Sequence, residues 1–266
     1  MVIVLGFFWG SFLGVLILRS LRLISVYEHH LTITPSSQLR LYRTGLKYLF
    51  GGRSRCDSCG TAIRAFHNIP LVSFLMLRGR CSTCQASIPK TLFFYELGTL
   101  AVACLIYGSV SDVVLQFGLL LLFSFFLIIA AIDYEKKIIP DVLSYGVFWL
   151  GIFVLNHYGV EALPSGLASA VCSYILIKAL QQFYLLVLKR DALGDADPLL
   201  VFATCVWLPF EWVPYFFIVA ASLTIAWVWI HSRRQPSMWD MQIPFGPGLA
   251  VSGFGFIFYY TVQRVG

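Results

Sequence analysis

The sequence predicts an all-α polytopic membrane protein, and three observations support this prediction. Hydrophobic residues make up 59% of the 266 residues. Only 12% are charged, against about 25% in a typical soluble protein. The mean hydropathy is +0.80, and apolar runs close to the roughly 20 residues that cross a bilayer recur along the chain.

Eight such runs predict about eight transmembrane helices. They cover residues 2–19, 92–110, 113–132, 142–157, 163–188, 198–209, 212–231 and 244–262. The first run has no basic region before it and no Ala-x-Ala cleavage site, so we expect it to remain as a helix. The run at 198–209 is short, because Pro209 ends it.

The charges predict how these helices cross the membrane. The chain has 19 basic and 13 acidic residues, for a net charge of +6. Residues 20–91 hold many of the lysines and arginines but only two acids, Glu28 and Asp57. Cytoplasmic loops collect Lys and Arg, so this segment is expected inside and both termini outside. This positive-inside sorting explains the basic balance, to which attraction to anionic membrane lipid can add, and the net charge does not indicate nucleic acid.

A cysteine cluster in the segment 20–91 predicts a metal site. Two Cys-x-x-Cys pairs are separated by residues 60–80, and their members are Cys56, Cys59, Cys81 and Cys84. Two pairs at this spacing favour one zinc ion held by four thiolates. A disulfide or redox pair is the alternative, which a reducing cytosol disfavours. Four protein ligands leave no open position, so this zinc would be structural.

Two aspartates at the edges of apolar runs are the candidate catalytic residues. Asp133 ends the run at 113–132, and Asp197 immediately precedes the run at 198–209. Threading eight helices puts both at the same face of the membrane. An acid at the hydrocarbon edge is costly and often functional. Two carboxylates brought together can share one proton, so that one activates water and the other donates a proton.

Structural roles for the same acids remain open from these observations alone. Asp133 could pair with a neighbouring lysine, Lys136 or Lys137, and Asp197 could cap a helix. The acids could also form a proton relay in a proton-coupled transporter. A third possibility is a non-enzymatic scaffold for pilus or secretion machinery. Lys178 is a basic residue in the interior of a predicted transmembrane run, the one at 163–188.

Several motifs, in this order, resemble the bacterial type IV prepilin peptidases, which are Gly-x-Gly-Asp aspartic intramembrane proteases. They are "GSFLGVLILR" at 10–19, the cysteine segment "CDSCGTAIRAFHNIPLVSFLMLRGRCSTC", "AAIDYEKKIIPD" around Asp133, "LGDADPLL" around Asp197 and "IPFGPGLA" at 243–250. The resemblance implies three parts. These are a first transmembrane helix at 1–19, a cytoplasmic zinc-binding domain at 20–91 and a seven-helix membrane domain carrying the aspartate dyad at 92–266.

The resemblance also implies an activity. Such enzymes remove the basic leader of prepilins and pseudopilins after a glycine, on the cytoplasmic side of the bacterial inner membrane. Many then methylate the new N-terminus with S-adenosylmethionine, for which the sequence indicates no binding residues. Expected partners are these substrates, membrane lipid, and pilus or type II secretion assembly proteins.

The signature itself differs from the family pattern at one glycine. This chain has Gly194-Asp195-Ala196-Asp197, so alanine stands where the family has its second glycine. Because alanine disfavours positive φ, we expect the backbone at Ala196 to stay in an ordinary region.

Overall fold

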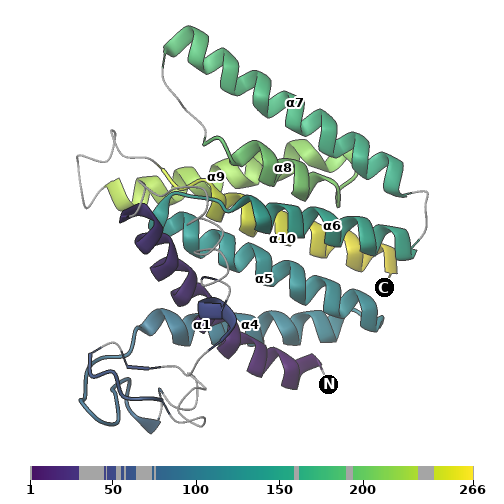
Figure 1. Ribbon diagram of the computed structural model, residues 1–266. Helices are drawn as coiled ribbons and strands as arrows, with labels where there is room; N and C mark the ends of the chain where they lie inside the picture. The colour runs from purple at the N-terminus through teal and green to yellow at the C-terminus, as the bar shows by residue number, and fades with distance from the viewer. Residues whose placement is uncertain are drawn as a thin grey trace. The chain divides into compact units, whose positions relative to one another are not determined.

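The computed structural model describes residues 2–29, 45, 47–51, 55–56, 58–63, 74, 76–158, 162–189, 194–232 and 243–265. These residues are mainly helical, and their only strand-like pairings are isolated bridges (Figure 1). The chain divides into two compact units, Met1–Gly108 and Ser109–Gly266.

The first unit contains two long helices, α1 (Val2–His29) and α4 (Lys90–Ser109). Glycines every four residues, at Gly6, Gly10 and Gly14, place one face of α1 against α4. A Cβ atom at Gly10 would lie only 3.0 Å from the Cα of Glu96. Small residues at this spacing let two membrane helices approach closely. The side chain of Glu96 is fully buried.

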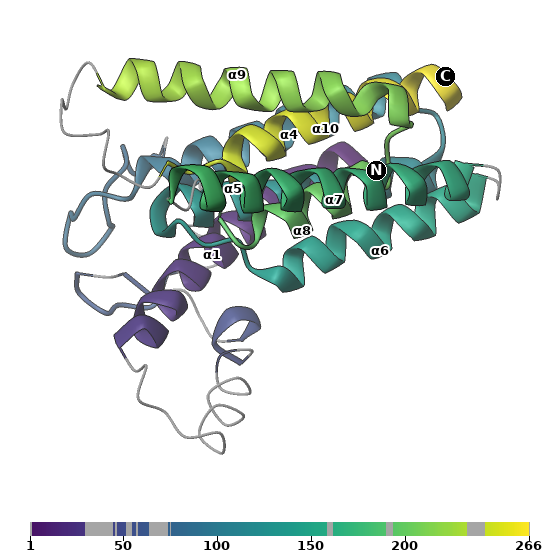
Figure 2. The same ribbon diagram turned by 90° about the horizontal axis from the view of Figure 1, so that it is seen from above.

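The second unit is a helical bundle. Its helices are α5 (Val113–Lys136), α6 (Asp141–Tyr158), α7 (Ala162–Leu188), α8 (Asp197–Cys205), α9 (Val213–Ser232) and α10 (Gly246–Val265), with the 3-10 turn η2 (Phe210–Trp212) before α9. Helix α10 packs against α5 and α9, whereas α8 packs against α6 and α7. The two views in Figures 1 and 2 show α10 lying along α5.

Helix α5 forms much of the core of this bundle and ends at the first candidate aspartate. Its N-terminus is capped by Asp112, whose carboxylate accepts a hydrogen bond of 2.8 Å from the Leu115 N–H. Fully buried apolar side chains follow at helical spacing, including Leu119, Leu122, Phe126 and Ile129. The helix stops at Lys137, which has a φ of 58° and donates its N–H to the Asp133 carbonyl.

In the part of the chain that the structure describes, five helices are long and apolar enough to cross a membrane, so the chain is a multi-pass membrane protein. They are Phe8–Val26, Lys90–Ser109, Val113–Lys136, Leu163–Val187 and Phe210–His231. Eight crossings are not confirmed. Residues 142–157 lie in α6 and residues 246–262 lie in α10, but these two helices do not meet the same criteria among the described residues.

The predicted crossing at 198–209 differs most from the structure. Helix α8 has nine residues, which gives a length of about 14 Å at 1.5 Å per residue. That is about half of a hydrocarbon core roughly 30 Å thick. The helix ends after Cys205, where the backbone hydrogen bonds span three residues in place of the four of an α-helix. Trp207 N–H donates to the Thr204 carbonyl, and Leu208 N–H donates to the Cys205 carbonyl.

Candidate active site and metal site

Asp133 lies near the C-terminal end of α5 and is 5% exposed. Its Oδ2 atom accepts a hydrogen bond of 2.9 Å from the backbone N–H of Gly246, the first residue of α10. The N-terminus of a helix presents unpaired N–H groups and partial positive charge, which favour a carboxylate at this place. A Cβ atom at Gly246 would lie 2.8 Å from Asp133 Oδ2. The absence of a side chain at Gly246 therefore allows this close approach.

Asp197 begins α8 and is 6% exposed. Its Oδ2 atom also accepts a 2.9 Å hydrogen bond from a glycine, in this case from the N–H of Gly194. The peptide N–H of Asp197 donates back to the Gly194 carbonyl at 3.2 Å, which closes the turn before the helix. Pro198 follows at the start of α8, where it needs no hydrogen-bond partner.

The two carboxylates influence each other electrostatically. Asp197 lies outside the five apolar helices named above. Burial, and secondly the negative charge of Asp133, raise the pKa of Asp197 to about 6. A neighbouring like charge disfavours a second ionised carboxylate, so the pair is suited to carrying one proton. In the described part of the chain, the glycine N–H groups are the only hydrogen-bond partners of these carboxylates.

One structural alternative, Asp197 as the N-cap of α8, does not match the observed contacts, whereas Lys137 does interact electrostatically with Asp133. Asp197 accepts its hydrogen bond from Gly194, outside α8, and the N-cap position of α8 is Ala196, which has no side-chain cap. The ammonium of Lys137 donates to the Tyr134 carbonyl at 2.8 Å. Both carboxylates thus keep an oxygen, Oδ1, that no described hydrogen bond occupies.

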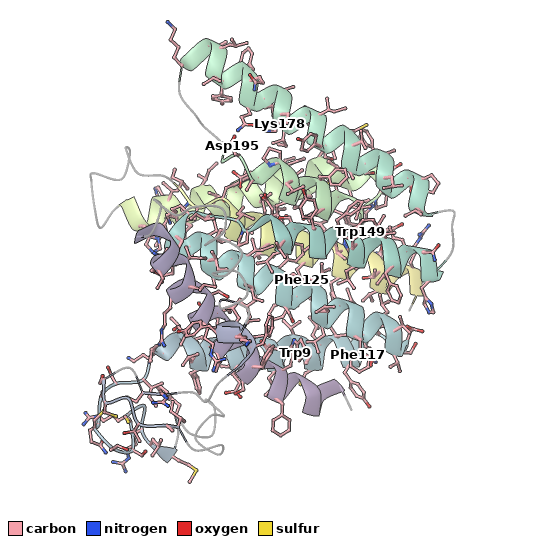
Figure 3. The ribbon with its side chains drawn as sticks, in the orientation of Figure 1. Trp9, Phe117, Phe125, Trp149, Lys178 and Asp195 are labelled. Atoms are coloured by element: carbon pink, nitrogen blue, oxygen red, sulfur yellow. The ribbon has the colours of Figure 1, made fainter. Side chains whose placement is uncertain are left out.

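The altered signature adopts the backbone that the sequence predicts. Ala196 has φ −87° and ψ −17°, an ordinary helical conformation that alanine accepts without strain. Asp195, the extra acid of this signature, is exposed in the turn before α8 and accepts a hydrogen bond from Gln181 of α7 (Figure 3).

The four predicted metal ligands come together at one place in the first unit. Their sulfur atoms all lie within 4.8 Å of one another, and the Sγ atoms of Cys56 and Cys84 are 3.7 Å apart. Tetrahedral coordination with metal–sulfur bonds of about 2.3 Å requires sulfurs about 3.8 Å apart. The cluster can therefore hold one metal ion. Backbone N–H groups of Cys84 and Thr83 lower the pKa of the Cys81 thiol, whereas the neighbouring thiols raise the pKa of Cys84, so the metal-free cluster keeps some of its protons.

Two turns of the same form build this cluster. In the first, Cys56 N–H donates to the Thr61 carbonyl and Gly60 N–H donates to the Cys56 carbonyl. In the second, Cys81 N–H donates to the Ala86 carbonyl and Gln85 N–H donates to the Cys81 carbonyl. The equivalent residues Gly60 and Gln85 have positive φ, of 69° and 60°. Each Cys-x-x-Cys pair is therefore held by its own local turn.

The chain is similar to known proteins over nearly its whole length. Residues 4–110 match the bacterial peptidase A24 N-terminal domain, and residues 120–229 match the type IV leader peptidase family. The "Prepilin leader peptidase/N-methyltransferase" of Stutzerimonas stutzeri is 32% identical over 259 residues, which cover 95% of this chain and 87% of the relative. The chain belongs to the type IV leader peptidase family. No solved structure matches the chain.

Further members of the family with the same name are similar over comparable lengths. The protein of Pseudomonas aeruginosa is 30% identical over 262 residues, covering 95% of this chain and 87% of the relative. The protein of Vibrio cholerae is 29% identical over 251 residues, covering 94% and 92%. The family match spans both units, including the cysteine cluster and both candidate aspartates.

Sequence reasoning missed the partners of the aspartates. Gly246 lies in the stretch "IPFGPGLA", which supported the resemblance, but its contact with Asp133 joins residues 113 positions apart. The sequence does single out Gly194, because it is the first glycine of the altered signature. Gln181 gave no signal, although its partner Lys178 was conspicuous as a charge within an apolar run.

Proposed function

We propose that this chain is a membrane aspartic endopeptidase that removes the leader of type IV prepilins and pseudopilins, with Asp133 and Asp197 as its catalytic pair. One observation supports the pair above all: two buried carboxylates interact electrostatically, and each is fixed by one glycine N–H. The substrate follows from family membership and from the relatives' names.

In this mechanism a water molecule lies between the two free carboxylate oxygens. The ionised aspartate takes a proton from the water while the resulting hydroxide adds to the scissile carbonyl carbon, and the protonated aspartate gives its proton to the carbonyl oxygen. The C–N bond then breaks as the leaving nitrogen receives a proton. The products are a leader with a new carboxyl group and a pilin with a new amine.

Placement at a helix end suits a substrate that lies in the membrane. Unpaired peptide groups are expensive in lipid, so a peptide bond is most easily opened where water reaches it. Asp133 lies at the last turn of α5, and Asp197 lies at the first residue of α8. The basic segment 20–91 supports a site facing the cytoplasm, in the inner membrane.

The cysteine cluster serves a structural purpose in this proposal, with zinc as its metal. Four thiolates complete a tetrahedral zinc site and leave no position for a substrate or a water. Cys56, Cys59, Cys81 and Cys84 would hold the ion and cross-link the two turns of a domain at 20–91. This domain lies between a first transmembrane helix at 1–19 and a membrane domain at 92–266.

Methylation of the new amine is a second proposed activity, supported by the word N-methyltransferase in the relatives' names. S-adenosylmethionine would supply the methyl group. The described residues assign no binding site to it. Pilus or type II secretion assembly proteins are proposed as further partners through the shared pilin substrates.

The test is cleavage of a purified prepilin by the detergent-solubilised protein, followed by mass spectrometry of the pilin. Asp133→Asn and Asp197→Asn should each abolish leader loss, because an amide cannot exchange the required proton. Asp141→Asn changes an exposed acid in the first turn of α6 and should cleave like the unaltered protein. Normal cleavage by either of the first two variants would overturn the assignment.

A further inference from the structure

Three polar side chains connect α7 to the turn that carries Asp197. The ammonium of Lys178 donates to Gln181 Oε1 at 3.0 Å, and Gln181 Nε2 donates to Asp195 Oδ1 at 3.2 Å. Figure 3 shows Lys178 on α7 beside Asp195 on the turn before α8. The middle side chain, Gln181, is buried. Helix α7, which carries Lys178 and Gln181, packs against α8, which follows the turn that contains Asp195.

The hydrogen-bonding groups of Lys178 and Asp195 match one orientation of the Gln181 amide. A lysine ammonium can only donate hydrogen bonds, and an ionised carboxylate can only accept them. The Gln181 amide satisfies both in one orientation, with its oxygen toward Lys178 and its nitrogen toward Asp195. Lys178 therefore favours the orientation in which the amide nitrogen of Gln181 faces Asp195.

Asp195 belongs to the same turn as the hydrogen bonds that hold Asp197. Gly194 N–H donates to Asp197 Oδ2, and Asp197 N–H donates to the Gly194 carbonyl. Asp195 is the next residue after Gly194. The hydrogen bond from Gln181 to the Asp195 side chain therefore also restrains the backbone of Gly194. Ala196 offers no side-chain cap to α8. The contact from α7 therefore adds a restraint from outside the turn to the hydrogen bonds that the turn makes within itself.

We propose that Lys178, Gln181 and Asp195 form a positioning relay that fixes the Gly194–Asp197 turn for catalysis. This inference rests on the proposed function of Asp197. None of the three residues is assigned contact with the substrate, and the relay acts through the direction of the Asp197 carboxylate. A displacement of a catalytic group by about 1 Å can cost roughly 100-fold in rate. Loosening the turn should therefore lower kcat and leave KM unchanged.

An exchange of acid and amide tests the relay. At about pH 6, above the ordinary pKa values of Asp and Glu, Gln181→Glu sets two carboxylates against each other and should lower kcat roughly 10- to 100-fold. Asp195→Asn keeps an acceptor oxygen for Gln181 and should lose less than about threefold. In the double variant the introduced asparagine amide donates to the introduced carboxylate on α7, so this variant should recover most of the activity that the single Gln181→Glu variant loses.

A neighbouring glutamine gives the matched control. Gln182→Glu makes the same change on the exposed side of α7, outside the relay, and should cleave like the unaltered protein. Lys178→Met removes the group that orients the amide and should lower kcat, whereas Lys178→Arg keeps a donor and should restore most of it. Metal content and thermal melting confirm that each variant is folded.

The outcomes separate this inference from the function on which it rests. If Asp197→Asn cleaves normally, the catalytic assignment fails. If Asp197→Asn is inactive but Gln181→Glu cleaves at the unaltered rate, the relay is overturned and the function stands. A double variant as slow as Gln181→Glu would also overturn it, because the exchanged pair would not act together. Should Gln181→Glu fail to fold, Lys178→Met decides: full activity there contradicts the relay.

Discussion

Replacing the two glycines that contact the aspartates, Gly246 and Gly194, by alanine should cause a large and a small loss of activity, respectively. A Cβ atom at Gly246 would lie 2.8 Å from Asp133 Oδ2 and 3.0 Å from the Cβ and Cγ atoms of Asp133. The whole Asp133 side chain would therefore have to move, and not only its carboxylate oxygen. An ordinary van der Waals contact needs at least 3.4 Å, and the oxygen must therefore retreat by about 0.6 Å in a close-packed interior. A Cβ atom at Gly194 would lie 3.2 Å from Asp197 Oδ2, which requires a retreat of about 0.2 Å.

The expected loss follows from these displacements. Moving Asp133 weakens its charge-assisted hydrogen bond, which contributes about 1.5–3 kcal/mol, and shifts the carboxylate from the water. We expect Gly246→Ala to lower kcat roughly 10- to 100-fold and Gly194→Ala to lower it less than about threefold. The assay is steady-state cleavage of a purified prepilin, with metal content and thermal melting as controls for folding. Full activity of Gly246→Ala, or a larger loss in Gly194→Ala, would refute the reasoning.

Four further predictions concern pH and the cysteine turns. The proton that Asp197 shares is lost as pH rises through about 6, so cleavage should fall about tenfold per pH unit on the alkaline side of the pair's upper pKa. A pH-rate profile that stays flat to about pH 10 would contradict this. The same raised pKa destabilises the fold as pH rises from about 4 to about 6, so the melting temperature should fall there, and Asp197→Asn should reduce that slope. Cys59→Ser should release the metal and lower the melting temperature of the first unit, whereas Cys104→Ser, outside the cluster, should keep the metal. Gln85→Gly should raise the stability of the metal-bound turn by about 1 kcal/mol, because Gln85 has a positive φ; a lower melting temperature would speak against this.

The local features of this protein were predictable from sequence. The cysteine cluster could be predicted because each Cys-x-x-Cys pair is shaped by its own turn, within about six residues. The ordinary backbone of Ala196 followed from the steric limits of alanine. Asp133 and Asp197 were conspicuous as acids beside apolar runs, and the resemblance then joined them into one site.

Long-range features were not predictable in the same way. The hydrogen bond from Gly246 to Asp133 depends on how α10 packs against α5, which hydropathy does not encode. The run at 198–209 is apolar because α8 is packed between α6 and α7, and a buried short helix has the same composition as a membrane crossing. The indole N–H of Trp207, donated to the Val147 carbonyl at 3.1 Å, likewise belongs to the buried interior.

The central claim is that Asp133 and Asp197 cut one peptide bond together. Single-turnover cleavage of a prepilin by Asp133→Asn, Asp197→Asn and the double variant tests it most directly. Residues that act as one unit are strongly non-additive, so the account predicts that each single variant loses as much rate as the double. Two partial losses that multiply in the double variant would contradict it, because each carboxylate would then work without the other.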